Sequence, residues 1–90
     1  MRLYRLQMTV NASRKTEAPE LFDRVFRSDN VQVRDVEVTS ASKGANIAMD
    51  VYLVQRSGSD VAWLAREAVR RAQTRTQGKL TIKNLEVVPA

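Results

Sequence analysis

The sequence predicts an α+β fold in which a four-stranded antiparallel sheet carries two helices on one face. Four segments alternate apolar and polar residues with the period of a strand, and two others repeat apolar residues at helical spacing. These segments follow one another in the order βαββαβ. A chain of 90 residues is short enough that we expect a single domain, residues 1–90.

The opening segment predicts a strand with one apolar face, formed by Tyr4, Leu6, Met8 and Val10. A helix is expected near Pro19, because proline is tolerated in a first helical turn. Thr16 or Ala18 is its capping residue, depending on where that turn starts. The apolar residues that follow recur at helical spacing and end before Asp29: Leu21, Phe22, Val25 and Phe26.

The second strand is predicted from valines at positions 31, 33, 36 and 38. Its inward face changes phase between Arg34 and Asp35, which indicates a β-bulge. Residues 41–44 form the turn to the third strand. That strand has the clearest alternation in the chain, through Ile47, Met49, Val51 and Leu53.

The second helix is expected to begin with Ser59 as its N-cap and with Asp60 placed favourably for the helix dipole. Its apolar stripe consists of Val61, Leu64, Ala65, Ala68, Val69 and Ala72. Gly78 can end this helix in a left-handed cap. A last strand follows, with a second change of phase, through Leu80, Ile82, Leu85 and Val87.

The order of elements resembles the ferredoxin-like arrangement, in which two helices pack on one face of a four-stranded antiparallel sheet. Right-handed crossovers then give the strand order 4-1-3-2, with the first and third strands in the centre. The two strands with phase changes become the edges, where bulges are common.

The net positive charge of the chain is concentrated between positions 66 and 83. The chain carries a formal charge of +5, and this stretch holds six basic residues and one acidic residue, so the rest of the chain is neutral. Such a concentration gives the molecule one basic side. An acidic protein surface or a nucleic acid is the kind of partner that it would attract.

The only tryptophan is predicted to lie on the outer side of the second helix. A step of about 100° per residue places Trp63, Arg66 and Arg70 opposite the apolar stripe. Tryptophan and arginine are enriched at the centres of protein interfaces. We therefore predict a partner-binding surface made of Trp63, Arg66, Arg70, Lys79 and Lys83. The alternative is that Trp63 leans on the first helix or a loop, and that the arginines are ordinary solvated residues.

The open face of the sheet is a second candidate surface. It is expected to show Leu3 and Arg5 from the first strand beside Tyr52 and Val54 from the third. Packing of two such sheets into a homodimer would cover this partly apolar face, as would another protein. The alternative is an ordinary scatter of exposed apolar side chains.

Open sheets of this kind also bind RNA, but the signature of the RNA recognition motif is incomplete. Lys43 and Gly44 fit its start, whereas Ala45, Ile47 and Asp50 stand where stacking aromatic residues are expected. Sequence-tolerant RNA or DNA binding through the basic helix and last strand remains the alternative function.

Arg14, Lys15 and Thr16 form a candidate anion site, because they precede the first predicted helix and its unpaired backbone N–H groups. A solvated basic loop is the simpler explanation.

Catalysis is not expected, because the chain has no histidine and no cysteine and its acidic residues are scattered. No cluster of ligands predicts a metal, and no cofactor is expected. Asp50 is predicted to form a cross-strand ion pair with Arg5 or Arg34.

These observations predict a small, basic, non-enzymatic interaction module that docks on the acidic surface of a protein partner. The N-terminus lacks the apolar run of a signal peptide, and no run approaches the length of a membrane span. A cytoplasmic protein is therefore expected.

Overall fold

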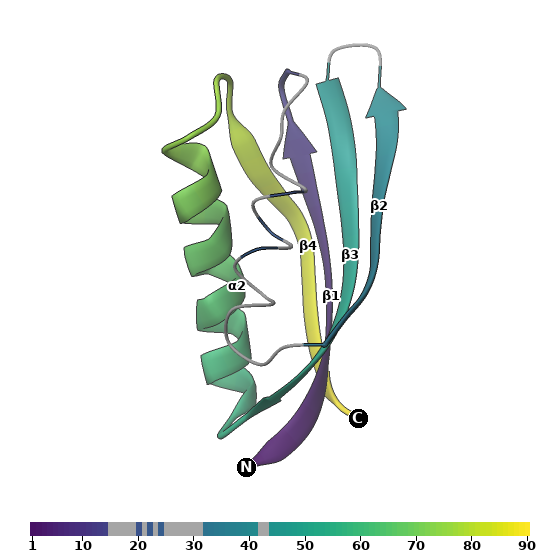
Figure 1. Ribbon diagram of the computed structural model, residues 1–90, viewed down its shortest axis with the longest axis vertical. Helices are drawn as coiled ribbons and strands as arrows, with labels where there is room; N and C mark the ends of the chain where they lie inside the picture. Colours follow the sequence, from purple (N-terminus) through teal and green to yellow (C-terminus); the bar gives the residue numbers. More distant parts are fainter. Residues whose placement is uncertain (15–19, 21, 23, 25–31, 42–43) are drawn as a thin grey trace.

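The structure is a computed structural model that describes residues 1–14, 20, 22, 24, 32–41 and 44–90 (Figure 1). The described chain contains the strands β1 (Arg2–Ala12), β2 (Gln32–Ala41), β3 (Gly44–Gln55) and β4 (Leu80–Pro89), and the helix α2 (Gly58–Gln73). The two ends of the chain lie close together, where the Ala90 backbone N–H donates a 3.0 Å hydrogen bond to the Leu3 carbonyl.

The strands form one sheet in the order β2-β3-β1-β4, and each neighbouring pair is antiparallel. β1 pairs with β3 over its whole length, from Arg2 opposite Gln55 to Ala12 opposite Ala45. The long central strands give the molecule its elongated shape, with extents of 40 × 20 × 19 Å.

The predicted fold class is wrong as stated, because the described chain places a single helix, α2, on the sheet. The ferredoxin-like βαββαβ pattern is thus matched only in part. Most of the first predicted helix lies outside the described residues, which include only Glu20, Phe22 and Arg24 from it. The prediction rested on periodicity over about two turns, and a helix so short depends on tertiary packing for its stability.

Both predicted phase changes are confirmed as irregularities in strand pairing. Between β2 and β3 the register shifts between Val33 and Asp35 and omits Arg34. Between β1 and β4 it shifts so that Thr9 lies opposite Asn84 and Val10 opposite Ile82, which leaves Lys83 in the bulge. An extra residue on one strand reverses the face on which later side chains lie, as the two apolar patterns require.

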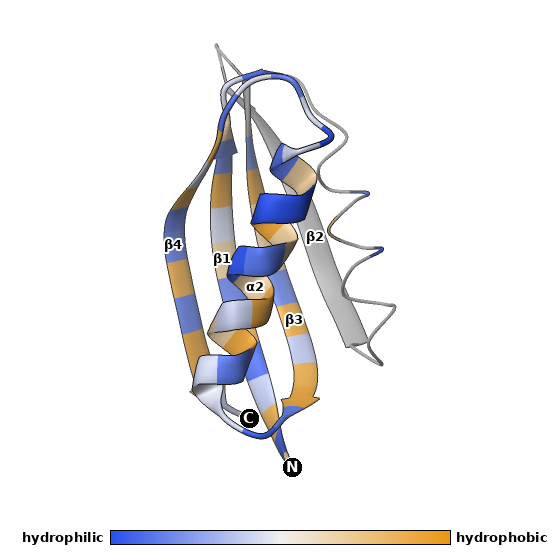
Figure 2. Ribbon diagram, turned by 90° about the vertical axis from the view of Figure 1, so that its left-hand side faces the viewer, coloured by the Kyte–Doolittle hydropathy of each residue, from blue (hydrophilic) through white to orange (hydrophobic). Residues whose placement is uncertain are grey.

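The core lies between the sheet and α2. The predicted inward residues of β1 and β3 are all buried, and so is the whole apolar stripe of α2: Val61, Leu64, Ala65, Ala68, Val69 and Ala72. Phe22 joins them with no exposed surface. Figure 2 shows α2 crossing in front of β1, and the alternation of hydrophilic and hydrophobic residues is visible along β4.

The ends of α2 differ from the prediction. Ser57, not Ser59, is the N-cap, because it has an extended backbone and its Oγ accepts a 3.2 Å hydrogen bond from the Asp60 N–H. The helix ends earlier than expected, with Thr74 as the C-cap in a right-handed conformation. Gly78 does have a positive φ of 84°, but it lies in the turn between α2 and β4.

Candidate docking surfaces

The outer side of α2 carries the predicted tryptophan and arginines. Trp63 is 61% exposed, so most of its side chain lies in solvent on the outer side of α2. Arg66 and Arg70 follow on the same side of the helix and are also exposed. The buried stripe fixes this orientation, since burial of its six residues leaves the opposite side of α2 in solvent.

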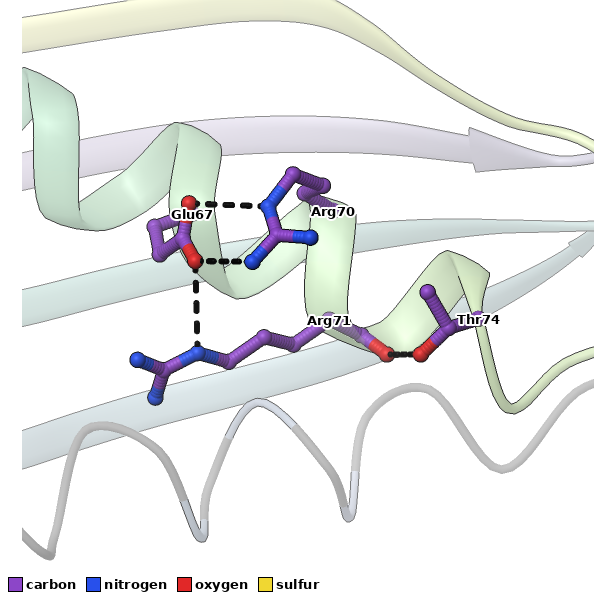
Figure 3. Close-up of polar contacts among 4 residues, drawn as sticks. All are labelled: Glu67, Arg70, Arg71 and Thr74. Carbon is purple, nitrogen blue, oxygen red and sulfur yellow. Dashed lines mark hydrogen bonds and ion pairs between the residues drawn. The ribbon is translucent and has the colours of Figure 1, made fainter.

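Glu67 forms ion pairs with two arginines of α2 (Figure 3). Arg70 donates from both Nε and Nη2 to the two carboxylate oxygens of Glu67, and Arg71 Nε lies 3.5 Å from Glu67 Oε1. The spacing of four residues favours a contact between Glu67 and Arg71, but the two-pronged contact comes from Arg70. The Arg70 hydrogen bonds lower the pKa of Glu67, and Glu67 in turn raises the pKa of Arg70. Among the described residues, Arg66 has no such ionic partner.

Lys79 and Lys83 lie away from Trp63. Lys79 is exposed in the turn beyond the C-terminal end of α2, and Lys83 is exposed in the bulge of β4. Trp63 belongs to the N-terminal half of the helix, and the eleven residues from there to the C-cap span about 16 Å. The five predicted partner-binding residues therefore divide into a helix group, Trp63, Arg66 and Arg70, and a group of two lysines.

The turn before β4 is fastened to the end of β1 by polar contacts that the sequence did not indicate. The Ser13 N–H donates to the Lys79 carbonyl at 3.0 Å, and the Lys79 N–H donates to Ser13 Oγ at 2.7 Å. Gln73 spans the same turn, because its Nε2 donates to the Gly78 carbonyl and its Oε1 accepts from the Leu80 N–H. No local pattern links positions 13 and 79, so these contacts could not be found from the sequence.

Of the candidate anion site, only Arg14 is within the described residues; Lys15 and Thr16 lie outside them. Arg14 is exposed beside the turn between α2 and β4. A Cβ atom placed on Gly78 would lie 3.2 Å from Arg14 Cγ. The structure thus brings Arg14 close to Lys79 and extends the basic end of the molecule.

The open face of the sheet brings together the four residues predicted for an oligomer interface. Leu3 lies opposite Val54, and Arg5 lies opposite Tyr52 in the next pair on the same face. Val88 of β4 lies opposite Arg5 on its other side, a neighbour that the prediction missed. Leu3, Val54 and Val88 are all more than one third exposed.

The predicted ion pair of Asp50 is confirmed, with Arg5 as a partner. Arg5 Nε donates to Oδ1 at 3.0 Å and Arg5 Nη2 donates to Oδ2 at 2.6 Å, diagonally across β1 and β3. The guanidinium carbon also lies 5.7 Å from the centre of the Tyr52 ring. Hydrogen bonding to Asp50 raises the pKa of Arg5. Farther along the same face, Asn11 Nδ2 donates to Asn46 Oδ1 at 2.9 Å.

Within the described part of the chain, no three histidine, cysteine, aspartate or glutamate side chains are grouped so that they could hold a metal ion. The helix that the structure describes is not long and apolar enough to cross a membrane.

Comparisons with protein-family models, with curated proteins and with solved structures found no match for this chain. The functional argument therefore depends on the side chains themselves.

Proposed function

We propose that the protein is a docking module whose α2 outer surface, Trp63 with Arg66 and Arg70, binds an acidic surface of a protein partner. The observation that carries this proposal is the 61% exposure of Trp63 on a helix whose opposite side is packed against the sheet. The helix is therefore firmly held, and the indole needs no rearrangement to reach a partner.

An exposed indole beside an arginine is well suited to bind a protein surface. Covering the exposed part of Trp63 contributes about 2 kcal/mol through removal of apolar surface from water. Arg66 follows one turn later and supplies a cation with five N–H donors. Such a pair is typical of the few residues that account for most of the binding free energy.

The charge of the surface favours an acidic partner. The Glu67 side chain is 16% exposed and forms ion pairs with both Arg70 and Arg71, so this group of three residues keeps a net positive charge. Arg66 adds another positive charge. Opposite charges on the two proteins would increase the association rate and select the orientation of binding.

Site-specific crosslinking tests this proposal. A photoreactive residue replaces Trp63 in one variant and Glu86 of β4 in a control, and crosslinked proteins are recovered after nuclease treatment. We expect a protein that crosslinks from position 63 and not from position 86.

The purified partner is then titrated with the Trp63→Ala and Arg66→Glu variants. Each should raise the Kd by at least about tenfold, in keeping with the loss of a central contact. Ser59→Ala, an exposed substitution on the same helix, should leave the Kd unchanged. Binding that is indifferent to both Trp63 and Arg66 would refute the proposal.

A second candidate function, sequence-tolerant nucleic-acid binding, is favoured by the contacts that bring Arg14 beside the turn at Lys79. Arg75 and Lys79 are exposed at this end of the molecule as well. Phosphate contacts by such side chains release counterions, so the affinity would fall steeply with salt. The test is binding to a mixed-sequence oligonucleotide at several salt concentrations. Lys79→Glu should weaken this binding and Trp63→Ala should not, the reverse of what protein docking requires.

Two other features of the proposal come from the sequence. The absence of catalytic activity is a prediction from the residue inventory, which lacks histidine and cysteine. A cytoplasmic site of action is likewise a prediction.

A further inference from the structure

The sheet face opposite α2 differs in character from the rest of the molecule. We define the open face as the outward side chains of the three strands for which the structure describes them, together with the exposed bulge residue Lys83: Leu3, Arg5, Gln7, Thr9 and Asn11 of β1, Asn46, Ala48, Asp50, Tyr52 and Val54 of β3, and Thr81, Lys83, Asn84, Glu86 and Val88 of β4. Most of it is polar, and its apolar residues gather at one end.

The apolar end consists of three side chains that are neighbours in the sheet. Leu3 pairs with Val54, and Val88 pairs with Arg5, the next outward residue of β1. They are 43%, 48% and 37% exposed, respectively. A patch of three aliphatic residues at one end of a sheet gains free energy when a second apolar surface covers it.

The main polar groups of the open face already have partners within the chain. Arg5 pairs with Asp50 and lies over the Tyr52 ring, and Asn11 is hydrogen-bonded to Asn46. Covering these groups therefore costs less than covering charges whose hydrogen bonds are made only to water. The apolar end can be buried without leaving its polar neighbours unpaired.

The distribution of charge favours a second copy of the chain as the molecule that covers the open face. The basic stretch from Arg66 to Lys83 belongs mainly to α2 and the following turn, whereas the charges of the open face as defined balance, with Arg5 and Lys83 against Asp50 and Glu86. Two copies of a chain with a charge of +5 repel each other when their basic sides approach. On the open face, an arginine of one copy can instead approach a carboxylate of the other.

The open face is large enough for a stable interface. The 11 residues of β1 extend about 36 Å, and the three strands that form this face cover a width of about 14 Å. The face therefore has an area on the order of 500 Å², more than half of the roughly 800 Å² that each partner contributes to a standard interface.

We propose that two copies of the chain pack open face against open face in a two-fold symmetric dimer, with Leu3, Val54 and Val88 in the contact. Each α2 then lies on the outside of the dimer, on opposite sides. Two-fold symmetry presents each docking surface twice, so the dimer engages two acidic sites at once with an affinity above that of either alone.

The test is sedimentation of the 90-residue chain over concentrations up to about 100 µM, which detects Kd values of micromolar order. We expect twice the chain mass of 10.2 kDa. Val54→Glu and Val88→Glu should each weaken the dimer at least about 30-fold, because they place a charge in an apolar contact. Trp63→Glu, a matched change on α2, should leave the dimer intact.

The folding of the variants and the contact between the two open faces are checked separately. Circular dichroism must show that each variant keeps the wild-type structure, and the absence of cysteine allows a single thiol to be placed at will. Thr9→Cys, on the open face, should be linked between chains by a short thiol crosslinker, and Ser59→Cys should not.

Three results would overturn the proposal: a wild-type chain that stays monomeric, a dimer lost through Trp63→Glu, or larger oligomers that dissolve in salt. The last would show head-to-tail binding of the open face to α2. A monomeric wild type would not bear on the docking proposal, which is tested with a different protein, whereas either of the other two results would show that a second copy binds the Trp63 surface.

Discussion

Ser13 and Lys79 exchange two hydrogen bonds across 66 positions of the sequence, through the Ser13 N–H and the Ser13 Oγ. This contact fixes the turn between α2 and β4 against the end of β1. It also leaves little room beside Gly78, which adopts a left-handed backbone in the same turn.

Gly78→Ala should lower the free energy of unfolding by about 1–2 kcal/mol, because the alanine would be held at positive φ. Its Cβ would also lie 2.6 Å from Ser13 Oγ. Chemical denaturation measures the effect. In the Ser13→Ala background the crowding is removed, so the cost of Gly78→Ala should be smaller, and equal costs in the two backgrounds would contradict this explanation.

Gly58→Ala is the matched control and should have the opposite sign. Gly58 lies in the first turn of α2, and a Cβ there would meet Val87 and Tyr4 at ordinary contact distances of 3.7 and 3.9 Å. A glycine replaced by alanine in a compatible helical conformation gains about 0.5 kcal/mol, mainly through lower entropy of the unfolded chain. Destabilisation by both substitutions would argue against a special role for Gly78.

Ser57→Ala should destabilise the protein by about 1 kcal/mol, because the Asp60 N–H loses the side-chain oxygen that caps α2. Ser59→Ala should change the stability by less than about 0.5 kcal/mol, as is usual for an exposed position. Thermal unfolding of the two single variants checks this order. A larger loss for Ser59→Ala would show that the helix begins where the sequence first suggested.

Phe22→Ala should cost about 3–5 kcal/mol, the usual penalty for removing a fully buried aromatic side chain. Phe22 has no exposed surface, so its removal leaves a cavity in the core. Trp63→Ala removes a larger side chain from an exposed position and should cost less than about 1 kcal/mol. Comparable losses for the two would mean that the indole is packed.

The stability that Glu67 contributes should depend on pH. Its pKa is lowered in the folded chain, from an ordinary value of 4.5, by the hydrogen bonds from Arg70. The contribution is therefore complete above pH 4.5 and is lost as the pH falls further, through the lowered pKa.

Denaturation of the wild type and Glu67→Gln at several pH values measures this contribution. The wild type should be more stable above pH 4.5, and the difference should shrink below it. Replacing both Arg70 and Arg71 by glutamine should remove the pH dependence of that difference. A difference that grows in acid would contradict the assignment.

Alternation along the chain was sufficient to find the strands and their irregularities. Tyr4, Leu6, Met8 and Val10 are buried together because a strand directs every second residue to one face. The skipped residues Arg34 and Lys83 follow from the same rule, since a change of phase requires an extra residue. The exposure of Trp63 was predictable from the stripe on α2.

Choices between equivalent neighbours could not be made from the sequence. Ser57 and Ser59 can both cap a helix, and only the backbone conformation selects Ser57. Arg70 and Arg71 both stand within reach of Glu67, and side-chain geometry decides that Arg70 makes the two-pronged contact. The two-helix layer was predicted from about two turns of apolar periodicity, whereas the described chain places only α2 on the sheet and most of the earlier segment lies outside the described residues.

Because Trp63 is the only tryptophan and lies at the surface, its fluorescence can report binding at α2 separately from unfolding of the chain. Because Trp63 is already largely in contact with water in the native chain, unfolding should change its emission little. A molecule that binds to α2 and covers Trp63 should shift that emission to shorter wavelength. One unlabelled sample therefore reports occupancy of the helix by fluorescence, while far-ultraviolet dichroism reports whether the sheet beneath it is intact.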